Sequence, residues 1–287
     1  MRNPLPFLAM HLYVQLVAAP CFIVYTLLTG KTSPFHLVNH LCEVLNVQFV
    51  RTKESSKLES GAVFLCNHRS WADFFVDQTL CGGGAYLSRM MVWVGTPTTS
   101  LWAWLSHSTW FFNRKPGIDR SAFGNWIDSQ FQVRPSPGLI AYPEGTRNQK
   151  AEPLKVKSGV LQYAYEFKRP IQCVITTNKD TVVNEKAAKL NRNVICMTHI
   201  SKPIYPKDFN SSKEFIASAR ELFNESWKSA YETKPEEGEM YRPPYGLKKP
   251  EFKNVPVRQR VWILRFVFML LAVLYVYRKQ RLALASV

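Results

Sequence analysis

The chain has 287 residues, of which 46% are hydrophobic and 13% aromatic, enough apolar material for a sizeable core. Its formal net charge of +16 indicates an anionic partner, such as nucleic acid, a membrane surface or a phosphorylated metabolite. Nucleic acid is the remotest of these, because the sequence has no zinc-finger spacing, RNP-like aromatic motif or basic zipper. The cysteines form no Cys-x-x-Cys pair and no His or Cys spacing is typical of zinc ligands, so we expect free thiols and no metal site.

The first predicted element is an apolar stretch over residues 5–29, which is long enough to cross a bilayer of about 30 Å. Arg2 precedes it, so a signal peptide is the alternative. The stretch is longer than a usual signal-peptide core, however, and Pro20 directly follows the small residues of a candidate cleavage site. We therefore predict an uncleaved N-terminal transmembrane anchor over residues 1–30.

Residues 31–60 are predicted to contain an amphipathic helix and a connector. Leu37, Leu41 and Val44 recur at helical spacing, whereas residues 51–60 are polar and charged. Two interpretations of the helix stay open: it leads away from the membrane, or it is an ordinary surface helix of the next domain.

From Gly61 onward, apolar runs typical of strands alternate with helical segments. This alternation predicts an α/β domain over residues 61–232, with a mixed, mostly parallel sheet flanked by helices. The candidate strands are residues 62–66, 85–88, 110–112, 139–142, 171–176 and 194–198, and the candidate helices are residues 71–80, 118–132, 159–167 and 213–231.

The stretch over residues 89–112 is rich in Trp, Met and Phe, but it is too interrupted to predict a membrane span. Core packing is one interpretation. The other is an interfacial surface or an acyl-chain pocket, because amphipathic Trp side chains favour membrane interfaces.

A candidate catalytic pair follows the first strand of the α/β domain. The strand runs into Asn67 and His68, and Asp73 opens the next predicted helix. A histidine near neutral pH can take a proton from an alcohol, and a carboxylate on its other ring nitrogen fixes the tautomer and stabilises the imidazolium. No Ser or Cys nucleophile is needed if the substrate supplies its own hydroxyl. A buried histidine beside a helix-capping aspartate is the structural alternative.

A candidate anion site follows the strand over residues 139–142. Pro143 and Glu144 lead into Gly145, which permits a tight turn and the close approach of a ligand to backbone amides. Arg147 carries the planar guanidinium that suits a phosphate. The alternative is a simple turn with an ion pair between Glu144 and Arg147.

The C-terminal part of the chain is basic. Residues 233–260 are rich in Pro, Lys and Glu and are predicted to be a linker. Residues 261–287 form an apolar segment with a basic tail, and a second membrane span and a helix lying on the membrane both remain open. Residues 241–287 contain ten Lys and Arg residues and a single acidic residue, Glu251. This excess of positive charge favours an anionic membrane surface as the partner.

Taken together, the motifs resemble those of the glycerolipid acyltransferase family (PlsC-type), over roughly Gly61 to Pro206. No motif is specific alone, but the four occur in the family's order and spacing. They are Asn-His-x-x-x-x-Asp at residues 67–73, Phe-x-x-Arg at residues 111–114, Pro-Glu-Gly-Thr-Arg at residues 143–147, and a Pro before an apolar strand at residues 170–175.

The resemblance implies acyl transfer from acyl-CoA, a co-substrate, to the free hydroxyl of a lysophospholipid, with no bound cofactor and no metal. The best-known members acylate 1-acyl-glycerol-3-phosphate to give phosphatidic acid. His68 would be the base and Asp73 would orient it. The residues implied at the acceptor-phosphate site are Arg114, Glu144, Gly145, Thr146 and Arg147, with Asn67 and Arg89 as further candidates.

Arg89 stands near the position where the family often carries a lysine, which leaves the acceptor open. Acceptors such as lysophosphatidylinositol or a lysocardiolipin fit the same motifs. A catalytically silent, lipid-binding membrane scaffold is the alternative from another class, although an intact His68 and Asp73 argue against it. Membrane localisation, in the endoplasmic reticulum, is expected from the resemblance, with membrane lipids as partners and no nucleic acid.

Overall fold

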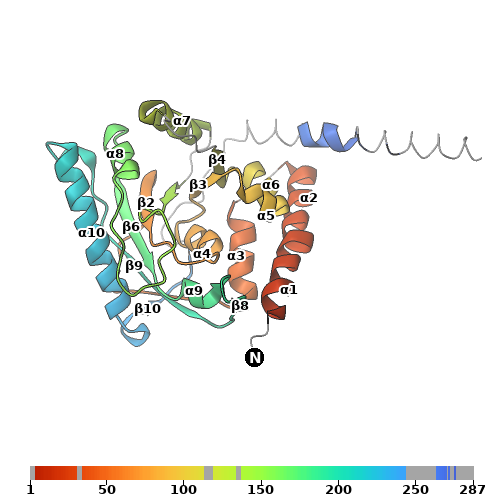
Figure 1. Cartoon of the computed structure of the whole chain (residues 1–287), viewed down its shortest axis with the longest axis horizontal. Helices are drawn as coiled ribbons and strands as arrows, with labels where there is room; N and C mark the ends of the chain where they lie inside the picture. Colours follow the sequence, from red (N-terminus) through yellow and green to blue (C-terminus); the bar gives the residue numbers. More distant parts are fainter. Residues whose placement is uncertain are drawn as a thin grey trace, which may run out of the picture.

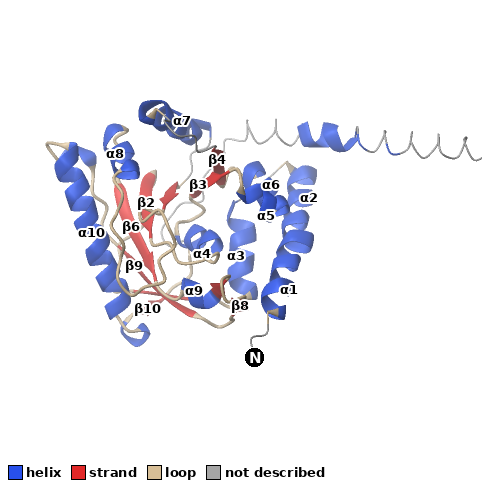
Figure 2. Cartoon of the chain, in the orientation of Figure 1, coloured by secondary structure: helices blue, strands red, loops and turns tan. Residues whose placement is uncertain are grey.

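The computed structural model describes residues 4–30, 34–112, 119–133, 137–243 and 263–269, together with residues 271 and 275. Within these residues, eight strands form one sheet in the order β10-β1-β9-β6-β2-β5-β3-β4 (Figures 1 and 2). The strands are β1 (Gln48–Arg51), β2 (Ala62–Cys66), β3 (Ala85–Arg89), β4 (Thr109–Phe112), β5 (Gly138–Ala141), β6 (Ile171–Thr176), β9 (Ile195–Ile200) and β10 (Glu239–Met240).

The sheet is mixed and mostly parallel, which confirms the predicted α/β class. Strands β6, β2, β5, β3 and β4 run parallel, and β9 is antiparallel to β6. Both faces of the central strands are covered, so β2 and β6 are buried at every position. This burial explains why these strands are continuous apolar runs rather than alternating patterns.

Helices lie on both sides of the sheet (Figure 1). α10 (Ser212–Glu232) packs on one face through residues spaced four apart, such as Phe215, Ala219 and Phe223. α7 (Arg120–Val133) and α8 (Gly159–Glu166) lie on the same side. The opposite face carries α3 (Pro34–Val44), α4 (Asp73–Leu80), α5 (Val92–Gly95), α6 (Pro97–Leu105) and the short α9 (Lys179–Val182).

α3 settles one of the open interpretations. Its apolar residues Leu37, Val38 and Leu41 are fully or almost fully buried, and the helix packs against α4. It is therefore an ordinary helix of the α/β domain. The sheet also begins earlier than predicted, because β1 lies inside the segment assigned to the connector.

α1 (Leu5–Tyr13), a π-helical turn (Val14–Ala18) and α2 (Ala19–Thr29) form one continuous helix, long and apolar enough to cross a membrane. Pro20 has no N–H to donate to the turn preceding it. The carbonyl of Gln15 instead accepts the hydroxyl of Thr98 at 2.7 Å, and Gln15 Nε2 donates to Thr99 Oγ1 at 2.6 Å. These bonds attach the helix to α6 at the irregular turn.

Two later segments differ from the prediction. Between the predicted strands over residues 171–176 and 194–198, where no strand was predicted, the chain forms α9 and a hairpin of β7 (Val183–Asn184) with β8 (Lys189–Leu190). β10 pairs with β1 inside the predicted linker. Of the C-terminal apolar segment, residues 263–269 are helical, and most of the remainder lies outside the described residues.

Candidate active site

The candidate base is placed by the end of β2. Because β2 lies between the parallel strands β5 and β6, the chain leaves it at the carboxyl edge of the sheet, where ligands of α/β proteins commonly bind. Asn67 is fully buried there: its Nδ2 donates to the carbonyl of Thr176 at 2.9 Å, and its Oδ1 accepts from the N–H of Thr176 at 3.0 Å. Asn67 therefore ties β2 to β6 and fixes the loop that carries His68.

The structure brings His68 and Asp73 together. His68 Nδ1 lies 2.5 Å from Asp73 Oδ2, and the same oxygen accepts the backbone N–H groups of Arg69 at 2.7 Å and Ser70 at 3.2 Å. An ionised carboxylate can only accept, so Nδ1 carries the hydrogen and Nε2 keeps its lone pair. The His68 side chain is 26% exposed, so a substrate can contact it. The Asp73 side chain is only 2% exposed and is shielded from solvent.

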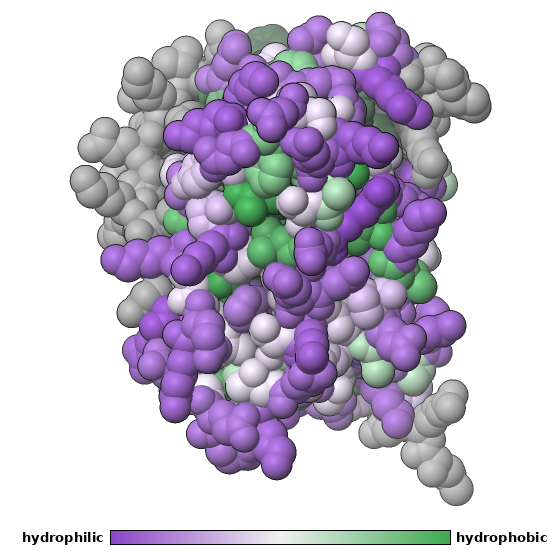
Figure 3. Space-filling model, turned by 90° about the vertical axis from the view of Figure 1, so that its left-hand side faces the viewer, coloured by the Kyte–Doolittle hydropathy of each residue, from purple (hydrophilic) through white to green (hydrophobic). Residues whose placement is uncertain are grey.

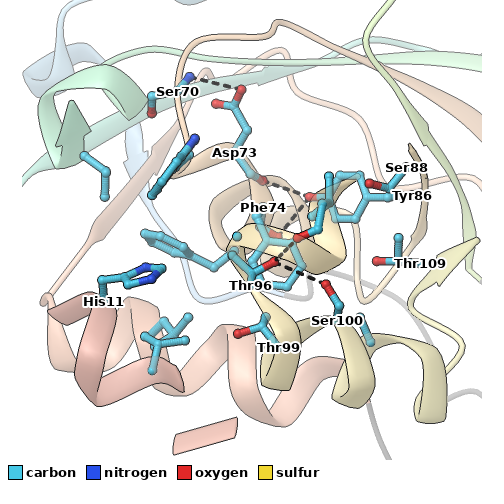
Figure 4. Close-up of a pocket in the computed structure, with 18 of the residues that line it drawn as sticks. His11, Ser70, Asp73, Phe74, Tyr86, Ser88, Thr96, Thr99, Ser100 and Thr109 are labelled. Carbon is cyan, nitrogen blue, oxygen red and sulfur yellow. Dashed lines mark hydrogen bonds between the residues drawn. The ribbon is translucent and has the colours of Figure 1, made fainter. Parts of the chain in front are cut away.

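Aromatic side chains hold this pair in place. The imidazole of His68 stacks on the ring of Tyr142, with centroids 4.3 Å apart and planes 20° apart. The Tyr142 hydroxyl donates to Asp77 Oδ2 at 2.9 Å. The Tyr86 hydroxyl donates to the carbonyl of Asp73 at 2.8 Å, as Figure 4 shows. The ring of His68 and the first turn of α4 are thus fixed from two neighbouring strands.

A second layer of buried charge lies beneath the pair. Lys179 Nζ is 2.7 Å from Asp77 Oδ2 and 3.4 Å from Asp73 Oδ1. Burial alone would raise the pKa of Asp73, but the ammonium of Lys179 and the hydrogen bond from His68 outweigh it and hold that pKa below its usual value. Burial raises the pKa of Asp77 to about 7, against the opposing effect of Lys179. Burial also disfavours the charged form of Lys179, yet the two carboxylates outweigh it and raise its pKa.

Glu144 points into the protein. Its Oε1 accepts the backbone N–H of His68 at 3.2 Å, and its Oε2 accepts from Asn148 Nδ2 at 2.8 Å and from the N–H of Leu154 at 3.0 Å. Both oxygens are therefore used inside the protein, and the residue is only 2% exposed. Glu144 therefore holds the loops around His68, and its implied contact with an acceptor stays a prediction.

The rest of the 143–147 turn reaches the surface. Gly145 has a φ of +72°, a left-handed backbone conformation that favours glycine at this turn. Thr146 is exposed. Arg147 pairs with the carboxylate of Glu185 rather than with Glu144. The turn thus exposes the guanidinium of Arg147 next to the accessible backbone of residues 145–147.

The two remaining arginine candidates are less informative. Arg114 lies outside the described residues, so its implied role at the acceptor phosphate stays a prediction. Arg89 ends β3 and is exposed, and its side chain does not contribute to the cavity beside His68.

A cavity of about 490 Å³ opens beside His68. Apolar side chains from the N-terminal helix, α3, α4, α5 and the β7–β8 hairpin form most of its wall, while Thr96, Thr99, Ser100 and Thr109 add hydroxyls (Figure 4). Arg147 lines the same cavity. The apolar residues that line the cavity include Phe7, Met10, Val14, Leu41, Phe74, Met91, Val92, Ala103, Val183 and Leu190.

The aromatic-rich stretch over residues 89–112 contributes both to the core and to the wall of this cavity. Trp102 and Trp110 are buried in the core, at 1% and 3% exposure. Met91 and Val92 line the cavity and are also exposed to solvent.

Sequence reasoning missed several residues at the site. Asp77 follows Asp73 by one helical turn, so a spacing signal existed. Lys179 and Glu185 gave no signal, because they come from segments about a hundred and about forty residues beyond their partners, Asp77 and Arg147. The N-terminal helix was expected to be only an anchor, yet it forms part of the cavity wall. Among the described residues, no group of three or more His, Cys, Asp or Glu side chains could hold a metal ion.

Comparison with known proteins identifies the domain that carries this site. The model of the acyltransferase family matches residues 47–177, which include His68, Asp73 and the 143–147 turn. Residues 47–177 are a domain of the acyltransferase family. The match confirms the resemblance stated from the sequence motifs, and it begins at the strand β1 that the predicted domain boundary had left out.

The fold is similar to that of a solved acyltransferase. The crystal structure of the 1-acyl-sn-glycerophosphate (LPA) acyltransferase PlsC from Thermotoga maritima matches with a TM-score of 0.58 and 15% sequence identity, covering 78% of this chain and 93% of that one. At this identity the likeness concerns the fold. A search of curated proteins gave no match.

Proposed function

We propose that this protein is a membrane-bound acyltransferase that transfers an acyl group from acyl-CoA to the sn-2 hydroxyl of 1-acyl-glycerol-3-phosphate, which gives phosphatidic acid. One observation carries the proposal: His68, backed by Asp73, opens onto a largely apolar cavity that Arg147 also lines. The apolar wall suits acyl chains, and a guanidinium suits a phosphate monoester. The acyltransferase family model over the same residues supports acyl transfer as the reaction.

The chemistry follows from the free lone pair on His68 Nε2. The imidazole takes the proton of the acceptor hydroxyl as its oxygen attacks the thioester carbonyl, and the imidazolium is stabilised by Asp73. When the tetrahedral intermediate collapses, the carbon–sulfur bond breaks and the imidazolium returns the proton to the thiolate of CoA. The acceptor supplies the nucleophile, so no covalent enzyme intermediate is required.

Membrane association is supported by an asymmetry of the surface. The side formed around α10 is largely hydrophilic (Figure 3). The N-terminal helix and α5, in contrast, expose large apolar side chains, such as Leu16 at 68%, Leu28 at 76% and Val94 at 79%. We propose that this apolar side enters the bilayer, with residues 1–30 as an anchor, so that an acyl chain reaches the cavity from the membrane.

The domain limits and the organelle belong to the same proposal. The catalytic domain would extend to about residue 232, followed by a linker to residue 260 and a membrane-associated segment over residues 261–287. Residence in the endoplasmic reticulum rests on the resemblance to the glycerolipid acyltransferase family.

The experiment that tests the proposal compares membranes containing the wild-type protein with membranes containing His68→Ala. Labelled oleoyl-CoA is offered with lysophosphatidate, lysophosphatidylinositol and lysocardiolipin. Phosphatidate formed by the wild type alone is the expected result. Transfer to another lysolipid would change the acceptor and keep the mechanism. Equal product from both proteins would remove His68 from the mechanism, and no product from either would favour a silent scaffold.

A further inference from the structure

A buried lysine lies under the candidate catalytic pair, just beyond the segment matched by the family model. Lys179 begins α9 and is fully buried. Its ammonium donates to the carbonyl of Asn67 at 2.6 Å and to Asp77 Oδ1 and Oδ2 at 2.8 and 2.7 Å. It also faces Asp73 Oδ1 at 3.4 Å, an oxygen that makes no hydrogen bond within the described part of the chain.

We propose that Lys179, together with Asp77, is a positioning residue that sets how much negative charge faces the imidazole of His68. The inference rests on the proposed acyl transfer, in which that imidazole gains and then loses a proton. Lys179 and Asp77 touch neither the substrate nor the reacting atoms, and they act through Asp73.

Charge counting gives the reason. Above about pH 7, where Asp77 is ionised, the two carboxylates and one ammonium leave one uncompensated negative charge in the buried cluster as long as His68 is neutral. When the imidazole accepts the proton of the acceptor, the cluster as a whole becomes neutral. An uncompensated charge is costly in a low-dielectric interior, so the arrangement favours the protonated imidazole that forms during the reaction.

The surrounding titratable groups leave this count unchanged. Burial raises the pKa values of the neighbouring thiols and phenols, which keeps them neutral; these are Cys42, Cys66, Cys196, Tyr86, Tyr142 and Tyr231.

The charged groups nearby are held by other partners. Arg69 pairs with Asp180, with Nε 3.0 Å from Oδ1, and Arg147 pairs with Glu185. Glu144 is bound through both of its oxygens to N–H donors. The balance at His68 therefore depends chiefly on Asp73, Asp77 and Lys179.

Removing one member of this set has an effect of predictable sign. In Lys179→Met the cluster loses its only ammonium, so Asp77, Asp73 and His68 all hold protons up to higher pH. The acid limb of the kcat–pH profile should then rise by about one to three pH units. In Asp77→Asn the cluster becomes less negative and the acid limb should move to lower pH. The double variant Lys179→Met/Asp77→Asn restores the count, and its acid limb should lie between those of the single variants.

The experiment measures these three variants, the wild type and the control Lys228→Met, which removes a lysine that is 71% exposed on α10. Acyl transfer gives the kcat–pH profile. In parallel, the rate at which diethylpyrocarbonate modifies His68 is followed by peptide mass spectrometry against pH. Only the neutral imidazole reacts, so this second readout needs no substrate.

In both readouts, we expect the pH dependence to shift in opposite directions in the two single variants. The shift should be smaller in the double variant and absent in Lys228→Met. A purely structural lysine would lower the rate or the Tm without opposite pH shifts, and that result would overturn the inference. If Lys179→Met does not fold, two other results test the inference. The acid limb should move to lower pH in Asp77→Asn, and it should return toward that of the wild type in the double variant. Absence of acyl transfer by the wild type would refute the proposed function alone, because the modification of His68 still tests the charge balance.

Discussion

The two sides of the candidate site differ in how firmly they are held. On the side of the base, the Asp73 side chain is 2% exposed, and Asp73 and His68 are fixed by backbone N–H groups and aromatic rings. On the side of the acceptor, Arg147 is 36% exposed and is held by an ion pair with Glu185. The first side is organised before substrate arrives, whereas the second can exchange one carboxylate partner for a phosphate. In the proposed reaction, this difference would place catalysis in the rigid core and acceptor choice at the surface.

The largest effect is expected when the rigid side is broken. In Asp73→Asn, the amide can donate to His68 Nδ1 and force the hydrogen onto Nε2, which then has no lone pair for the acceptor. We expect kcat to fall by about a hundred- to ten-thousandfold. The measurement is the initial rate of acyl transfer at saturating acceptor. Asp208→Asn, at an exposed position, is the control. A change in KM without a change in kcat would contradict the assignment of Asp73.

The acceptor side should respond differently. Arg147→Ala removes a charge-assisted contact worth about 1.5–3 kcal/mol, so the KM for lysophosphatidate should rise about ten- to a hundredfold, with a smaller change in kcat. The KM of Arg147→Lys should lie between those of the wild type and Arg147→Ala, because a lysine keeps the positive charge but loses the two parallel N–H donors of the guanidinium. Arg242→Ala removes an exposed arginine beside β10 and serves as the control. An unchanged KM in Arg147→Ala would show that the phosphate binds elsewhere.

The same contrast explains what could be predicted from the sequence. His68, on the loop after β2, and Asp73, at the start of α4, are five residues apart, so their pairing follows from local chain geometry and could be inferred. The contact between Lys179 and Asp77 joins residues 102 positions apart, and only the sheet brings them together. Glu144 was implied at the phosphate by its motif, but the motif does not show that its carboxylate turns inward. Strand β1 is only four residues long and the β7–β8 hairpin has two-residue strands, so neither gives a clear periodicity.

A third prediction concerns the apolar wall that adjoins the rigid side. Gly95 ends α5 and lines the cavity, and a Cβ there would meet nothing within 4 Å. Gly95→Leu should therefore fill part of the cavity without disturbing the fold. We expect the ratio of kcat/KM for long over short acyl-CoA donors to fall by about tenfold. Gly159→Leu, at another open position that does not line the cavity, is the matched control. Equal losses for all chain lengths would mean that the acyl chain lies outside this cavity.

The smallest expected effect tests whether the acceptor side is held only by an exchangeable partner. Glu185 bonds both Arg147 and the backbone N–H of Trp71, the latter at 3.3 Å. In Glu185→Gln the ion pair is lost while a hydrogen bond to Trp71 can persist, so Arg147 becomes free for a phosphate. An ion pair at the surface is worth about 0.2–1 kcal/mol, so the KM for lysophosphatidate should fall by up to about fivefold.

The matched control for this last variant is Glu232→Gln, which removes a carboxylate that is 67% exposed on α10. The double variant Glu185→Gln/Arg147→Ala should show no gain over Arg147→Ala, because the benefit acts through the guanidinium. A rise in KM in Glu185→Gln would instead show that Glu185 orients Arg147 toward the phosphate. In that case the acceptor side would be organised in advance in the same way as the base.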